Sequence, residues 1–97
     1  MKHFIDTHDK TKGSFPAEDM TEAEFIRLYQ KFEKAFEEVG GAALGAHVNV
    51  QGRKAFCFTK GADSDAIRQA HEKLNFPFDS ITEVKRVTGA DLRPELD

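Results

Sequence analysis

The strongest structural signal in the sequence is an apolar stripe between residues 21 and 41. Apolar side chains recur there at three- and four-residue spacing, as on one face of a helix: Phe25, Leu28, Tyr29, Phe32, Ala35, Phe36 and Val39. Thr21 and Glu24 stand at the two positions of a capping box, which marks a helix start. Gly40 and Gly41 follow the stripe and accept the left-handed conformation that ends helices. A helix of this length has to bury its stripe against a second layer, so the remaining segments must supply one.

Those remaining segments supply four strand patterns and a second helix. The helix is predicted to begin after Asp63, a good N-cap, and to stop at Asn75, which Pro77 follows. Short alternating or β-branched stretches predict strands over residues 2–8, 42–50, 54–59 and 80–88. Gln51-Gly52-Arg53 separates the two middle strands and is typical of a hairpin connection.

The resulting order is strand, helix, strand, strand, helix, strand. This βαββαβ order predicts an α+β, ferredoxin-like fold, with both helices on one face of a four-stranded antiparallel sheet. At 97 residues the chain has the length of one domain, so we expect a single domain over 1–97 with a polar tail at 89–97.

The faces of the strand at 54–59 predict a covered sheet. Phe56 and Phe58 point to one face, yet Ala55, Cys57 and Thr59 on the opposite face are not strongly polar. One face lies under the helices, so the other needs a cover as well. We expect a homodimer that forms through the open sheet face.

Composition excludes several classes of function. The formal net charge is −3 and the pI about 5.8, whereas a nucleic-acid-binding protein normally has a basic excess or a basic stripe. The chain has no apolar run of the roughly 18 residues that a membrane span needs, and its first residues do not resemble a signal peptide. Cys57 is the single cysteine, which excludes an intrachain disulfide and suits a reducing compartment. We therefore expect a cytoplasmic protein.

Candidate ligands for a metal converge at one edge of the predicted fold. The topology brings together the end of the first strand, the start of the third, the end of the second helix and the start of the fourth strand. The polar and metal-ligating residues at these places are Asp6, His8, Asp9, Cys57, His71, Ser80, Thr82 and Glu83. Imidazole suits zinc, copper or nickel, carboxylates complete a shell, and a thiolate favours softer ions. The spacing matches no compact metal motif.

Each of these residues also has a structural interpretation. His71 could border the core or interact with the helix dipole, and Asp6 and Asp9 could form a turn. Cys57, between two phenylalanines, could be an inert buried thiol, while His3 and His47 are expected on the surface or on a sheet face. An enzymatic alternative is a dimeric α/β-barrel protein that holds a small molecule between sheet and helices, with His8 or His71 as acid or base.

Five segments together resemble a family of small bacterial proteins of largely unassigned role, described as nickel-binding or nickel-responsive. The segments are Asp6-Thr7-His8, Phe56-Cys57-Phe58, the helix from Ala66 to His71, Phe76-Pro77 and Ile81-Thr82-Glu83-Val84. The resemblance implies a ferredoxin-like homodimer that binds nickel through histidine and carboxylate groups. By position it implies roles for two histidines, a cysteine, a glutamate and an aspartate: His8, His71, Cys57, Glu83 and Asp6.

We therefore expect a metal-binding protein rather than an enzyme, with nickel as the first candidate ion and zinc or copper next. His8 and His71 are the expected nitrogen ligands, and Asp6 or Glu83 the oxygen ligand. Cys57 is a supporting or optional sulfur ligand. A role in metal buffering or sequestration follows by analogy with the family.

Overall fold

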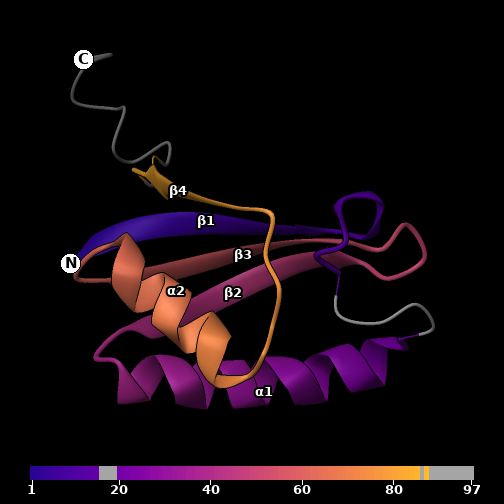
Figure 1. The fold of residues 1–97 in the computed structure, drawn as a ribbon, viewed down its shortest axis with the longest axis horizontal. Coiled ribbons are helices and arrows are strands. Elements are labelled where there is room, and N and C mark those ends of the chain that lie inside the picture. The colour runs from indigo at the N-terminus through magenta and orange to yellow at the C-terminus, as the bar shows by residue number, and fades with distance from the viewer. Residues whose placement is uncertain (16–19, 86, 88–97) are drawn as a thin grey trace, which may run out of the picture.

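Four antiparallel strands form one sheet, and two helices cover one of its faces (Figure 1). The structure is a computed structural model that describes residues 1–15, 20–85 and 87. Its strands are β1 (Lys2–Asp9), β2 (Ala42–Asn49), β3 (Lys54–Gly61) and β4 (Ser80–Val84), in the sheet order β2-β3-β1-β4. The helices are α1 (Glu22–Glu38) and α2 (Ser64–Lys73). The predicted ferredoxin-like α+β fold is confirmed.

Both helices begin at the caps that the sequence predicts. The Thr21 hydroxyl accepts a hydrogen bond from the Glu24 backbone at 3.1 Å, and the Glu24 carboxylate accepts one from the Thr21 backbone. In α2 the Asp63 carboxylate accepts a hydrogen bond from the Ala66 backbone at 3.0 Å. The turns after the helices are left-handed, with φ of 77° at Gly40 and 51° at Asn75. The start and end of each helix are therefore determined by neighbouring residues, independently of tertiary contacts.

Two segments differ from the prediction. β4 ends at Val84 rather than continuing to residue 88, because Val84 pairs with His3 and β1 begins only one residue earlier. The loop after β1 contains a short 3-10 helix, η1 (Lys10–Lys12), whose first turn is capped by Asp9. Residues 86 and 88, and the predicted polar tail at 89–97, lie outside the described residues.

The core fills the space between the helices and the sheet. Its buried members come from every layer: Phe4, Phe32, Ala35, Phe36, Cys57, Ile67, Ala70 and Phe76. A smaller cluster of Phe15, Phe25 and Ala55 continues it along α1. On the opposite sheet face Phe56 is 48% exposed. Within the described part of the chain, neither helix has the length and apolarity to cross a membrane.

Candidate metal centre

The strand pairing brings the predicted ligands to one place under the helices. Asp6 and His8 are two residues apart on β1, so their side chains share a face of the sheet, the one that the helices cover. Cys57 on β3 is the direct neighbour of Asp6 in the sheet register. His71 reaches the same position from the last turn of α2. Four of the five predicted ligands are therefore close together.

Asp6 is the centre of this group. Its Oδ2 atom lies 2.8 Å from Nε2 of His8 and 2.9 Å from Nε2 of His71. All three side chains are buried, with at most 1% of their surface exposed. One carboxylate oxygen therefore contacts two imidazoles in an environment without bulk water.

Backbone carbonyls fix the other nitrogen of each imidazole. Nδ1 of His8 lies 2.6 Å from the carbonyl oxygen of Pro77 and 3.2 Å from that of Ser14. Nδ1 of His71 lies 2.7 Å from the carbonyl oxygen of Ile67, one turn earlier in α2. A carbonyl only accepts, so both Nδ1 atoms carry a proton and donate it. Metal-binding histidines are commonly oriented by such a bond from the nitrogen that does not bind the metal.

The two Nε2 atoms consequently need a positive charge between them and Asp6. In a neutral imidazole with its proton on Nδ1, Nε2 holds a lone pair, and a lone pair facing a carboxylate oxygen is repelled. The contacts become favourable when protons on Nε2 donate to Asp6, or when a metal cation takes the place of those protons. The geometry therefore suits a group that exchanges protons for a cation.

The electrostatics of Asp6 agree with this interpretation. Burial alone would raise the pKa of its carboxyl, but hydrogen bonds from His71 and His8, and their positive charge, outweigh burial and hold the pKa below the usual 3.8. Asp6 is thus an anion at neutral pH. A buried anion between two histidines is a favourable environment for a cation.

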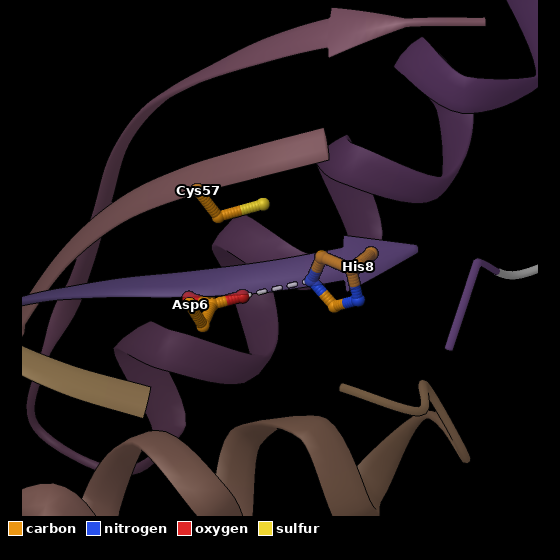
Figure 2. A group of neighbouring side chains, drawn as sticks. All are labelled: Asp6, His8 and Cys57. Atoms are coloured by element: carbon orange, nitrogen blue, oxygen red, sulfur yellow. Dashed lines mark hydrogen bonds and ion pairs between the residues drawn. The ribbon is translucent and has the colours of Figure 1, made fainter. Parts of the chain in front are cut away.

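Cys57 adds a sulfur atom to the group, as Figure 2 shows. Ligand atoms of Asp6, His8 and Cys57 all lie within 4.8 Å of one another, and the Cys57 side chain is fully buried. Burial, followed by the negative charge of the adjacent Asp6, raises the pKa of the thiol well above its usual value. In the metal-free protein Cys57 therefore keeps its proton, which a bound metal would displace.

The donor set fits a divalent transition metal. It offers two imidazole nitrogens, a carboxylate and a thiol, a mixture typical of zinc, nickel or copper sites. Neighbouring ligand atoms that are each 2.0–2.1 Å from one ion lie roughly 2.9–3.4 Å apart, close to the Nε2–Oδ2 distances found here. In addition, Oδ1 of Asp6 is buried and accepts no hydrogen bond from any described residue. That oxygen is free to contact a cation.

Glu83, the fifth predicted ligand, lies elsewhere. It is on β4 opposite Phe4, its side chain is more than half exposed, and its carboxylate lies 3.8 Å from the Lys2 ammonium. Asp9, also at the predicted edge, instead caps η1 by accepting a hydrogen bond from the Thr11 backbone at 2.9 Å. Of the two predicted carboxylates, Asp6 therefore lies next to the histidines and Glu83 does not.

Several neighbours of the group were not predicted from the sequence. The carbonyls of Ser14, Ile67 and Pro77 belong to the backbone, so no residue type signals their role. Phe76 stacks on His8 with ring centroids 4.4 Å apart, and Phe32 packs edge-on against His71 at 4.7 Å. The Phe76-Pro77 pair after the α2 turn could have indicated this cover, because a proline there brings the chain back over the helix end.

The fold and this group together define a ferredoxin-like α+β protein with a buried His-Asp-His cluster beside a thiol. The sequence profile of one family, described as nickel responsive protein SCO4226-like, matches residues 4–84. The chain belongs to this SCO4226-like family.

Among the solved structures similar to the chain are one crystal structure and one NMR structure. The crystal structure of SCO4226 from Streptomyces coelicolor A3(2) is 20% identical, with a TM-score of 0.73 over 89% of this chain and 99% of that chain. The NMR structure of the heavy metal binding protein TM0320 from Thermotoga maritima is 18% identical, with a TM-score of 0.48 over 84% of this chain and 98% of that chain. No curated protein matches. At 20% identity, the likeness to SCO4226 establishes the shared fold.

Proposed function

We propose that this protein binds one divalent transition metal ion per chain through His8, His71 and Asp6, with Cys57 as the sulfur ligand. The main support for the proposal is that Nε2 of His8 and Nε2 of His71 both contact the same buried oxygen of Asp6, at 2.8 and 2.9 Å. The Nδ1 atom of each histidine donates its hydrogen bond to a backbone carbonyl instead. Only a positive charge makes this arrangement favourable. A cation bound there would contact two neutral imidazoles and an anion.

Nickel is the first candidate ion, followed by zinc and copper. Imidazole nitrogens suit all three, and the family description is what favours nickel. The four donor residues are at most 1% exposed, which favours holding an ion over catalysis on an external substrate. We infer a role in buffering or sequestering the metal, in the cytoplasm, where the free Cys57 stays reduced.

We further propose that the protein is a homodimer that forms through the open face of the sheet. Ile5, Leu44, Phe56 and Phe58 lie around a hollow of about 510 Å³ on this face. A second copy of the same sheet would cover these apolar side chains.

The alternative, a small-molecule enzyme that uses His8 or His71, requires a cavity that both histidines line. His71 lines a hollow of about 420 Å³ with the segment from Asn75 to Phe78, whereas His8 lines a separate one of about 250 Å³ beside Lys12 and Asp79. The two rings contact the same carboxylate rather than a shared space. We therefore retain metal binding as the proposed function.

Calorimetric titration of chelator-treated protein with nickel and zinc tests the proposal. We expect one site per chain in the wild type and no site in His8→Ala or His71→Ala. The matched controls are His3→Ala and His47→Ala, because these histidines lie outside the buried group, and they should bind like the wild type. Wild-type binding no tighter than that of the His8→Ala variant would overturn the assignment.

A further inference from the structure

The side chains of the metal centre are closed off from solvent, so an ion reaches them only if part of the protein moves. Asp6, His8, Cys57 and His71 are each at most 1% exposed. A buried metal site needs an entry path, and in many proteins a loop that opens and closes provides one. The segment that moves should be the one whose displacement breaks the fewest contacts.

The strands and helices around the site are firmly held. β1 is hydrogen-bonded on both sides, to β3 and to β4. α2 contributes Ile67 and Ala70 to the core, and both have 0% exposure. The same is true of Phe32 and Phe36 on α1. Moving any of these elements would break the sheet or open the core, at a cost close to that of unfolding the domain.

One connection beside the site belongs to neither the sheet nor a helix. Residues 76–78, which we call the strap, run between the end of α2 and the start of β4 (Figure 1). The Phe76 N–H donates to a carbonyl in the last turn of α2 at 2.9 Å, and the Asp79 N–H donates to the Thr7 carbonyl at 2.7 Å. Asn75, just before the strap, has a φ of 51°, which is uncommon for a residue other than glycine. The strap is thus anchored at both ends and begins at a sharp backbone turn.

The strap covers both imidazoles of the metal centre. Phe76 stacks on His8, with ring centroids 4.4 Å apart. Phe78 packs edge-on against His71 at 5.0 Å. Between these two rings, the carbonyl of Pro77 accepts the hydrogen bond from Nδ1 of His8 at 2.6 Å, while the rest of Pro77 is exposed. A single layer of chain therefore separates solvent from both histidines on this side of the site.

We propose that the strap is the gate of the metal centre, which swings outward from Asn75 to let a divalent ion enter and leave. This inference rests on the proposed function, because it requires an ion at the His-Asp-His group. Opening exposes Phe76 and breaks the Pro77 contact with His8, but it leaves the four strands paired and both helices packed. Closure restores the hydrogen bond that orients His8 as a ligand.

The substitution Phe78→Ala removes the ring that covers His71 and alters no ligand. The ring contact is present in the closed protein with or without an ion, so its loss favours opening equally in both states. The rates of nickel uptake and of nickel release should therefore both rise about fivefold, the change expected from one aromatic contact, and Kd should stay constant. Stopped-flow absorbance measures uptake, and a chase with excess EDTA measures release. Val48→Ala, a half-buried position on β2 at the far edge of the sheet, is the control and should change neither rate.

Pro77→Ala tests the backbone of the strap and keeps the carbonyl that His8 uses. Alanine gives the open strap more conformational freedom than proline does, so both rates should rise about threefold, again with constant Kd. Wild-type rates in both variants, or an equal rise in Val48→Ala, would overturn the gate. A faster release with unchanged uptake would also overturn it, because the strap would then only position the ligands. These outcomes leave the proposed function intact, whereas an absence of nickel binding by the wild type would overturn both.

Discussion

At the scale of single residues, the decisive feature is the direction in which each imidazole is held. Carbonyls of Pro77 and Ile67 receive the Nδ1 protons of His8 and His71, so both Nε2 atoms are directed at Asp6. A lone buried histidine satisfies its hydrogen bonds in many ways, but two on one carboxylate oxygen need a shared positive charge. Protons on the two Nε2 atoms can supply this charge, and a metal ion at the proposed site would compete with them for the same three side chains.

The lowered pKa of Asp6 predicts how the stability of the metal-free protein depends on pH. Because the folded pKa lies below the usual 3.8, ionised Asp6 stabilises the fold above about pH 4, and this contribution is lost as the pH falls through the folded value. Asp6→Asn, which cannot ionise, should lower the free energy of unfolding at pH 7 by about 3 kcal/mol. Urea denaturation at a series of pH values measures both effects.

The difference between wild type and Asp6→Asn should shrink in acid. Asp65→Asn is the control, because Asp65 forms an exposed ion pair with Arg68 and should cost at most about 1 kcal/mol at any pH. A difference for Asp6→Asn that stays constant from pH 7 down to pH 2 would show that its charge does not stabilise the fold.

At the scale of helices and strands, boundaries marked by neighbouring residues could be predicted from the sequence. Boundaries that depend on pairing with another strand could not. Thr21 and Asp63 mark their helices because capping involves neighbouring residues only. The end of β4 depends instead on where β1 begins, because Val84 pairs with His3. The residues around Val84 contain no signal for this strand end. The same division applies to the site: topology predicted which residues approach, whereas the choice of Asp6 over Glu83 depends on how α2 packs on the sheet.

The capping box of α1 gives a prediction at this scale. Thr21→Ala removes the acceptor for the Glu24 backbone and should lower the free energy of unfolding by about 1 kcal/mol. The metal stoichiometry should stay at the wild-type value, because no ligand is altered. Arg27→Ala, an exposed change in the same helix, should fall within about 0.5 kcal/mol of wild type. Equal losses in the two variants, measured by urea denaturation, would show that the box does not stabilise the protein.

At the scale of the whole molecule, the two faces of the sheet have different roles. The helix face is closed and holds the His-Asp-His group, whereas the opposite face has apolar side chains and Phe56 is 48% exposed. Stable protein interfaces bury roughly 800 Å² from each partner, which is the area that a dimer formed through this face would have to bury. The alternation of Phe56 and Phe58 with Cys57 along β3 predicted two apolar faces from sequence alone. It did not predict which of the two faces holds the thiol.

Phe56→Lys tests the proposed dimer. A charge at the centre of a face-to-face sheet contact is unfavourable, so this variant should be monomeric. The wild type should have the mass of a dimer by light scattering at micromolar concentration. Ile26→Lys, which places the same charge on exposed α1, should remain dimeric. A monomeric wild type would contradict the proposed assembly without affecting the metal centre.

Anomalous diffraction from crystals of the nickel-loaded protein tests directly whether the buried His-Asp-His group binds the metal. We expect one strong peak per chain, about 2 Å from Nε2 of His8 and of His71 and in contact with the Asp6 carboxylate. The peak should disappear in crystals of His71→Ala. Nickel found only at exposed histidines such as His47, with the buried group unchanged, would show that the His-Asp-His group is not a metal site.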